Sequence, residues 1–304
     1  MPQQFATGVA LVLVAVLLWG AQLPIAKGAF AAVDPYHVSV IRYGVATLLL
    51  APIVAWREGP ASFRYYGRVW PVSLLGVIGM TCSPLLVFAG LAVTRPEHAV
   101  MIVSLQPSLA AIADWLLRGR RPDRFTRACI VTAFVGVVLV VTKGNPALAI
   151  GRGELLGDLL VLAGAACWVF YTIGTESFRG WPVLKLTTLT LIPGSIGLVV
   201  ATAALVPLGI ARVPTWGEIG SVGGELALLA LGGVLAGMIC WNAGTKRIGA
   251  LNSMLMLNLM PVVVFAIEFA QGQRFEPVEL VGAGLVIGAL AANNLYLRRV
   301  HAPR

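Results

Sequence analysis

The chain has 304 residues, 58% of them hydrophobic and only 12% charged, and its mean hydropathy is +0.87. Because a soluble domain carries roughly 25% charged residues, this composition excludes an ordinary soluble protein and predicts one surrounded mostly by lipid. The net charge of +9 does not indicate nucleic-acid binding, since the basic residues are scattered between apolar runs and form no continuous stripe.

Ten apolar segments are long enough to cross a membrane. A bilayer core of about 30 Å is crossed by a helix of about 20 apolar residues. The short connections between the segments carry the proline, glycine and charged residues that end helices. The predicted fold class is therefore an all-α membrane protein with ten transmembrane helices. They are predicted over residues 4–28, 35–56, 68–92, 97–117, 125–142, 154–177, 182–207, 223–246, 250–271 and 277–297.

The first segment and the basic residues predict the orientation of the chain. No basic region precedes the first segment and no clear cleavage pattern follows it, so we expect a membrane span rather than a removed signal. Placing the N-terminus in the cytoplasm puts fifteen of the 22 Lys and Arg residues on that side and six outside, with Arg42 inside a span. Both termini are therefore expected in the cytoplasm.

A short pattern occurs twice in the chain. A polar residue stands three positions before a proline at Ser104 and Pro107, and again 154 residues later at Asn258 and Pro261. Each copy is followed by an acidic residue and an aromatic residue. Because a proline inside a helix removes one backbone hydrogen bond, both copies predict a kinked helix.

The duplication extends to the first and sixth spans. Gly8 and Trp19 match Gly157 and Trp168 at an offset of 149 residues. Because each half holds five spans, an odd number, the second half must enter the membrane from the opposite side. The sequence therefore predicts two inverted five-helix repeats, over residues 1–147 and 148–304.

Motifs for enzymatic chemistry are absent from the sequence. It contains no phosphate-binding GxxxxGK[ST] loop, no HExxH and no GxSxG. The histidines, His37, His98 and His301, are too dispersed to suggest a metal site or a triad. The four cysteines lie in apolar runs without CxxC spacing, which indicates neither a disulfide framework nor a zinc site. We expect no enzymatic activity, no metal and no cofactor.

Polar and aromatic side chains share helical faces in the first and sixth spans. Trp19 and Gln22 lie three apart, as do Trp168 and Tyr171, with Thr175 four residues further on. Polar groups in hydrocarbon are costly unless they face protein or a water-filled cavity. These faces predict the wall of a central cavity for an amphipathic organic solute. Alternatively the tryptophans fill helix contacts or anchor at an interface, although both lie well inside their spans.

The kinked spans supply further candidates. Met101 and Ser104 share a face of the fourth span, and Asn258 lies near Pro261 in the ninth. Such residues can line a cavity, or they can form hydrogen bonds between helices. Weaker candidates are Trp241 in the eighth span and Ser83 beside a proline in the third.

The ionisable residues within spans bear on the energy source. Asp114 has Arg118 one turn away, which favours a surface ion pair over proton coupling. Glu268 has no basic residue at the same spacing and is the better candidate for a titrating group. Arg42 lies about 10 Å into the second span, where it either snorkels outward or meets a substrate carboxylate. No acid falls near the predicted midplane, so proton coupling is not required.

The chain resembles the drug/metabolite transporter superfamily, specifically its ten-span bacterial exporters. The resemblance rests on Trp19-Gly20 followed by Lys27, on Arg42, and on a proline in each of the fourth and ninth spans. It implies two inverted five-helix repeats around a central cavity and export of metabolites from the cytoplasm. The chain departs from many members in having Gly119-Arg120 and Gly272-Gln273 where they have Gly-Glu.

The aromatic face makes the chain similar to the bacterial aromatic amino acid exporters. We therefore expect export of aromatic or other apolar amino acids by alternating access. The alternatives are a broad exporter of drugs or metabolites, and a membrane-embedded binding or scaffold protein without transport. The expected partners are a small-molecule substrate and the lipid of a bacterial inner membrane, with a single chain sufficing for function. The candidate substrate-binding residues are Trp19, Gln22, Arg42, Ser83, Met101, Ser104, Trp168, Tyr171, Thr175, Trp241 and Asn258, and the candidate coupling residue is Glu268.

Overall fold

The computed structural model describes residues 2–119, 121–145 and 154–300. Every regular element in these ranges is a helix. Nine helical segments of the described residues are long and apolar enough to cross a membrane, and a shorter apolar helix covers Pro277–Asn293. The prediction of an all-α membrane protein with ten transmembrane helices is confirmed. The predicted boundary between the two halves, at residue 147, lies outside the described residues.

Six of the ten spans are continuous helices, and four are interrupted. The continuous spans are α1 (Pro2–Ala29), α2 (Pro35–Glu58), α7 (Arg124–Thr142), α9 (Glu154–Thr175), α10 (Val183–Leu205) and α16 (Pro277–Val300). Short helices in the connections are η1 (Pro60–Phe63), η3 (Glu176–Phe178) and α11 (Trp216–Ser221).

The interrupted spans occupy corresponding places in the two halves. The third span consists of α3 (Val69–Gly76), η2 (Val77–Cys82) and α4 (Ser83–Val93), and the eighth of α12 (Gly223–Ala227), η4 (Leu228–Ala236) and α13 (Gly237–Ile248). Both η2 and η4 are π-helical. The fourth span consists of α5 (Pro96–Val103) and α6 (Gln106–Arg118), and the ninth of α14 (Ala250–Met256), η5 (Leu257–Leu259) and α15 (Met260–Ala270).

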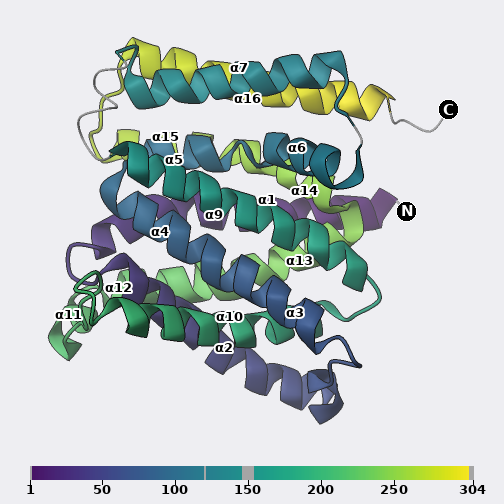
Figure 1. Cartoon of the computed structure of the whole chain (residues 1–304), viewed down its shortest axis with the longest axis vertical. Coiled ribbons are helices and arrows are strands. Elements are labelled where there is room, and N and C mark those ends of the chain that lie inside the picture. The colour runs from purple at the N-terminus through teal and green to yellow at the C-terminus, as the bar shows by residue number, and fades with distance from the viewer. Residues whose placement is uncertain (1, 120, 146–153, 301–304) are drawn as a thin grey trace.

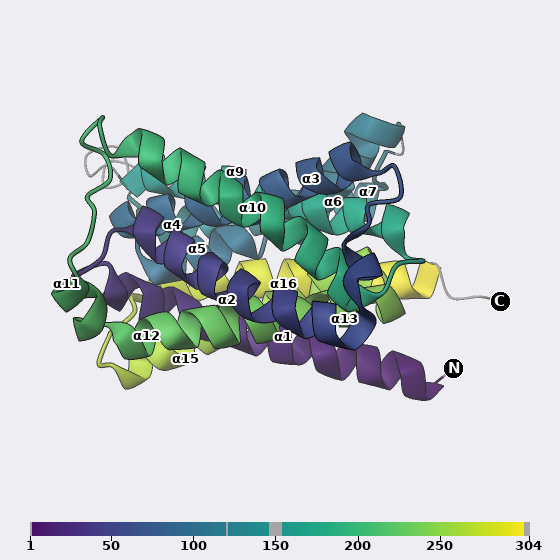
Figure 2. The same ribbon diagram turned by 90° about the horizontal axis from the view of Figure 1, so that it is seen from below.

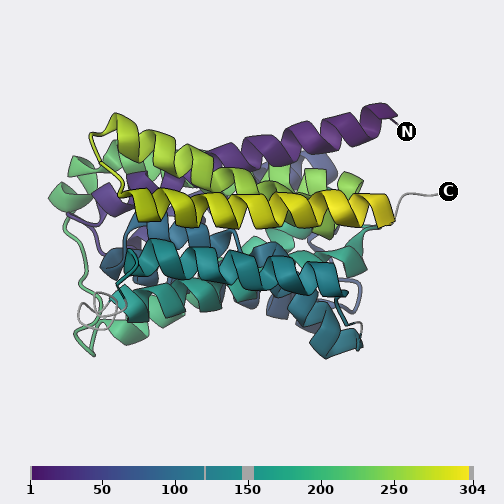
Figure 3. The same ribbon diagram turned by 90° about the horizontal axis from the view of Figure 1, so that it is seen from above.

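The helices lie side by side along one direction, with α1 beginning and α16 ending at the same end of the bundle (Figures 1 and 2). Since α9 begins at the opposite end, α1 and α9 run in opposite directions (Figure 1). The α7 and α16 helices form a neighbouring pair along one face (Figures 1 and 3). The centre contains α1 packed on α13 and α4 packed on α9.

Glycines allow the closest helix crossings at the centre. A Cβ atom on Gly244 would lie 2.9 Å from the carbonyl oxygen of Gly8, where α13 crosses α1. A Cβ atom on Gly157 would lie 2.8 Å from the carbonyl oxygen of Gly90, where α9 crosses α4. Gly8 matches Gly157 at the offset of 149, and Gly90 matches Gly244 at the offset of 154. The two halves therefore make corresponding contacts, as expected of duplicated sequences.

Prolines account for the breaks in the fourth and ninth spans. Pro107 and Pro261 stand in the first turn of α6 and α15, where the missing N–H group costs no helical hydrogen bond. The preceding helices end at Val103 and Met256. The chain thus changes direction near the middle of both spans, which brings the residues beside the breaks toward the centre.

Candidate functional site

A partly open cavity lies between the two halves of the bundle. Its lining comes from α1, α2, α4, α5, α6 and α9, together with η4, α13, η5 and α15. Five residues chosen from the sequence are in the lining: Trp19, Gln22, Arg42, Ser83 and Trp168. Trp19 and Gln22 of the first span and Trp168 of the sixth therefore meet at one space.

Arg42 is the charged side chain of this cavity. It is only 3% exposed, and its Nη1 donates a 2.9 Å hydrogen bond to Oε1 of Gln22. Its guanidinium carbon lies 3.7 Å from the centre of the Phe88 ring. The Nε atom has no hydrogen-bond partner, and no carboxylate of the described residues forms an ion pair with Arg42. Arg42 points into the cavity lining rather than snorkelling outward.

A buried cation without a partner is costly inside a membrane. The desolvation penalty for such an ion is on the order of several kcal/mol, and intramembrane charges usually pair or face a water-filled site. The quadrupole of the Phe88 ring and the Gln22 amide offset part of that cost. An anionic ligand would supply the missing counter-charge.

Aromatic rings form one wall of the cavity. The rings of Trp19 and Trp168 meet edge to face, with their centres 5.1 Å apart. Trp241 lies behind them, 5.0 Å from Trp19 and 6.0 Å from Trp168, and Tyr171 stacks 5.0 Å from Trp168. Trp241 and Tyr171 are fully buried and absent from the lining. They support the two lining tryptophans, Trp19 and Trp168, from behind.

The π-helical segments pack against side chains of the cavity and of the aromatic wall. Nε1 of Trp19 donates a 2.8 Å hydrogen bond to the carbonyl oxygen of Gly233 in η4. A Cβ atom on Gly233 would lie 2.7 Å from Oε1 of Gln22. In the other half, a Cβ atom on Gly79 in η2 would lie 2.5 Å from the ring of Tyr171. Gln22 matches Tyr171 at the offset of 149, and Gly79 matches Gly233 at the offset of 154. The two glycine contacts therefore occupy corresponding places in the two halves.

Asn242 links three helices beneath the aromatic wall. Its Nδ2 donates to the hydroxyl of Tyr171 at 3.1 Å and to the hydroxyl of Thr187 at 2.8 Å. Asn242 and Thr175 both line a second, smaller space near the ends of α9 and α13. Thr175 is thus on this second space and not on the central cavity.

The candidates beside the helix breaks are buried but do not line the central cavity. Met101 and Ser104 are fully buried, and the Ser104 hydroxyl donates to the carbonyl oxygen of Val100 at 2.8 Å. Asn258 is 8% exposed, and its Oδ1 has no hydrogen-bond partner among the described residues. Their roles remain predictions.

Reading the sequence missed the other twelve lining residues, among them Phe88, Gln106 and Tyr43. Gln106 is in the repeated pattern itself, one residue before the proline, and its Oε1 lacks a hydrogen-bond partner in the part of the chain that the structure describes. Assigning Met101 and Ser104 to one face assumes that the fourth span is a continuous helix. Because α5 ends at Val103, Gln106 after the break does not follow that helical spacing.

The ionisable candidates lie toward the ends of the bundle. Glu268 is half-buried on α15 and interacts electrostatically with Glu97 and Arg95, away from the cavity lining. The predicted pair of Asp114 and Arg118 is untested, since the Arg118 side chain is outside the described part of the chain. Lys27 caps the end of α4, where its Nζ donates to the carbonyl oxygens of Leu91, Ala92 and Thr94.

Ten apolar helices around a cavity with a buried cation and an aromatic wall define a membrane transporter of small molecules. The chain belongs to the EamA-like transporter family, which it matches over residues 6–142 and 155–295. The two matched ranges fall on the two five-helix halves. This family is part of the drug/metabolite transporter superfamily, so the resemblance seen in the sequence is confirmed at that level.

Relatives of known name are also described as transporters. The uncharacterized transporter YrdR of Bacillus subtilis is 33% identical over 302 residues, covering 97% of this chain and 94% of that protein. The uncharacterized transporter YyaM of the same organism is 31% identical over 279 residues, covering 91% and 90%. A solved crystal structure shares the fold with a TM-score of 0.71 at 20% identity, over 98% of this chain and 99% of that one.

Proposed function

We propose that this protein exports aromatic or other apolar amino acids, with Arg42 binding the substrate carboxylate. The observation that carries the proposal is the buried Arg42 side chain, which faces the cavity without a carboxylate partner among the described residues. Since Nη1 is engaged by Gln22, the unpartnered Nε and the neighbouring Nη2 form the edge that a carboxylate can take with two hydrogen bonds.

The rest of the cavity suits the other end of such a substrate. Trp19 and Trp168 present ring faces and edges at which an aromatic or branched apolar side chain can pack. Gln106 offers an unpartnered carbonyl oxygen, which could accept a hydrogen bond from the substrate ammonium group. An anion site, an acceptor and an apolar wall together match an apolar amino acid.

The alternative of a broad drug or metabolite exporter differs in the charge of the ligand. No Asp or Glu is among the described residues that line the central cavity. A cationic drug would therefore meet Arg42 without a compensating carboxylate. This charge pattern favours anionic and zwitterionic substrates over cationic ones.

We further propose that the protein lies in a bacterial inner membrane with both termini in the cytoplasm. Support comes from the excess of Lys and Arg on one side and from the common end at which α1 begins and α16 ends. One chain supplies the cavity, so we expect a monomer to transport. The breaks beside the cavity, before α6 and α15, are the expected hinges for alternating access.

Transport by purified protein in liposomes tests the proposal. Labelled phenylalanine and tryptophan should leave loaded liposomes in the presence of the protein, and Arg42→Gln should abolish that flux. Arg64→Gln is the matched control, because Arg64 is exposed in the connection after α2. Equal flux in the two variants would remove Arg42 from the site. Flux of a cationic dye with none of amino acids would favour the alternative, and absence of any flux would indicate a binding or scaffold protein.

A further inference from the structure

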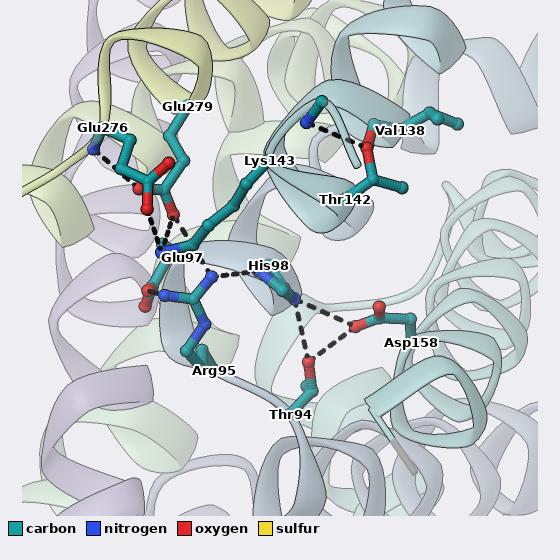
Figure 4. A network of polar contacts seen from close by, with 11 residues as sticks. Thr94, Arg95, Glu97, His98, Val138, Thr142, Lys143, Asp158, Glu276 and Glu279 are labelled. Carbon is teal, nitrogen blue, oxygen red and sulfur yellow. Dashed lines mark hydrogen bonds and ion pairs between the residues drawn. The ribbon is translucent and has the colours of Figure 1, made fainter. Parts of the chain in front are cut away.

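A cluster of polar side chains, some of them buried, lies where α5 and α16 begin (Figure 4), at the end of the bundle opposite the termini (Figure 1). We call it the polar cluster. It joins the connection between α4 and α5 to α7, α9 and α16. His98 and Glu279 are fully buried, and Glu97 is 1% exposed. Its members are Thr94, Arg95, Glu97, His98, Lys143, Asp158, Glu276 and Glu279.

The contacts of His98 fix the position of its ring proton. Nη2 of Arg95 lies 2.7 Å from Nε2 of His98. Because a guanidinium group only donates hydrogen bonds, Nε2 must be the acceptor and carry no proton. The neutral ring then holds its proton on Nδ1, which faces the Thr94 hydroxyl at 3.3 Å. That hydroxyl in turn donates to Oδ1 of Asp158 at 2.6 Å, so every donor meets an acceptor.

A proton added to Nε2 would reverse this arrangement. Two donors and two positive charges would then face each other across 2.7 Å, so Arg95 would have to move away from His98. Arg95 also binds Glu97 through Nη1 at 2.9 Å and Glu279 through Nη2 at 3.2 Å. Its displacement would loosen the ion pair that connects α5 to α16.

Charged groups from several helices surround His98. The carboxylates near His98 outnumber the cations, and one of them, Asp158, lies 3.7 Å from Nδ1. Glu97 further interacts with Lys27 of α1 and with Glu268 of α15. The facing groups are Arg95 and Glu97 at the start of α5, Asp158 on α9, Lys143 at the end of α7, and Glu276 and Glu279 at the start of α16.

The polar cluster is connected to the central cavity through α5. His98 and Val103 are on the same short helix, about 7.5 Å apart along its axis at 1.5 Å per residue. The helix ends at Val103, and the lining continues at Gln106 after the break. A shift of α5 at its His98 end would therefore reach the cavity lining.

We propose that His98 is a proton-binding site whose occupancy opens the link between α5 and α16 and couples transport to the proton gradient. Its coupling part rests on the proposed transport function, whereas its proton-binding part does not. Glu268, chosen from the sequence as the coupling candidate, interacts with the same cluster but is half-buried and forms no described ion pair.

Hydrogen exchange of the purified, full-length protein tests the proton site without a substrate. Exchange of residues 94–104 and 276–284 is compared between wild type and His98→Gln at about pH 5.5 and about pH 7.5, which bracket the ordinary histidine pKa. Glutamine keeps an acceptor for Arg95 and a donor for Thr94. We expect wild type to exchange about tenfold faster than the variant at the lower pH and equally at the higher pH.

His37→Gln is the matched control, because His37 also pairs with an acid, Asp34, at the same end of the bundle. It should retain the wild-type response. The same pH response in His98→Gln as in wild type would overturn the proposal. If His98→Gln does not fold, the pH dependence of hydrogen exchange in wild type alone tests the proposal. After correction for intrinsic exchange, residues 94–104 and 276–284 of wild type should exchange faster at the lower pH relative to α10. The absence of that increase would overturn the proposal.

Flux in liposomes with and without a pH gradient tests the coupling part. We expect the gradient to change wild-type phenylalanine flux several-fold and to leave His98→Gln flux unchanged. Gradient dependence lost in Glu268→Gln and kept in His98→Gln would contradict the assignment to His98. Absence of phenylalanine flux in wild type would contradict the proposed function while the hydrogen-exchange result still decides the proton site.

Discussion

Replacing Arg42 by methionine should separate stability from binding. Methionine keeps most of the length of the side chain and removes the charge. The change loses one hydrogen bond to Gln22, about 1 kcal/mol, and the contact with the Phe88 ring, about 2 kcal/mol in a desolvated site. It also removes a desolvation penalty of several kcal/mol for an ion without a partner. Without substrate, Arg42→Met should therefore be as stable as wild type or more stable by about 1 kcal/mol.

Binding should change in the opposite direction. A carboxylate held by two charge-assisted hydrogen bonds contributes about 3 kcal/mol, which corresponds to about 100-fold in affinity. Thermal unfolding of the purified protein with and without phenylalanine measures both effects. Wild type should gain stability on adding phenylalanine, whereas Arg42→Met should not. A variant that is clearly less stable yet binds phenylalanine normally would refute this reasoning, because Arg42 would then be a structural residue.

Three further predictions concern the aromatic wall, a glycine of the π-helical segments, and the cap of α11. Trp168→Ala should reduce the preference for phenylalanine over leucine about tenfold in competition assays, because the aromatic contacts with the substrate are lost; unchanged preference would place the wall elsewhere. Gly79→Ala should destabilise the protein by about 1–3 kcal/mol, because the added Cβ atom would meet the Tyr171 ring. Gly284 has open space around it, so Gly284→Ala should leave thermal unfolding unchanged. Equal effects of the two substitutions would contradict this packing. Hydrogen bonds from the Thr215 backbone and from Arg212 lower the pKa of Glu218 to about 2. The cap of α11 should therefore persist below the ordinary carboxylate pKa and be lost only as the pH falls through about 2, which hydrogen exchange of residues 215–221 would detect; loss near pH 4.5 would contradict it.

Much of the fold follows from the sequence because membrane helices are specified by length and hydropathy. The ten apolar segments and the breaks at Pro107 and Pro261 need no tertiary information. The approach of Trp19 to Trp168 also follows from the repeat, since duplicated helices at equivalent positions pack around the same centre.

The π-helical segments could not be predicted in this way. A shift from ordinary helical bonds to longer ones carries no distinctive residue pattern. Gly79 and Gly233 are readable as small residues, but the side chains they accommodate come from the opposite half of the chain. The need for glycine becomes visible only when both helices are present.

The polar cluster was hidden for a similar reason. Arg95 and Glu279 are separated by 184 positions, and each looks like an ordinary charge at the end of a span. His98 appears isolated among apolar residues. Local spacing cannot predict ion pairs between distant helices, and only the packing of α5 against α9 and α15 and its ion pair to α16 bring these groups together.

Competition for binding between three related ligands tests the central claim most directly. Phenylalanine, 3-phenylpropionate and 2-phenylethylamine share the aromatic ring, but only the first two carry a carboxylate. We predict that phenylalanine and phenylpropionate displace labelled phenylalanine from wild type, that phenylethylamine does not, and that Arg42→Met binds none of them measurably. Displacement by phenylethylamine as effective as that by phenylalanine would contradict a site built around Arg42 and the substrate carboxylate.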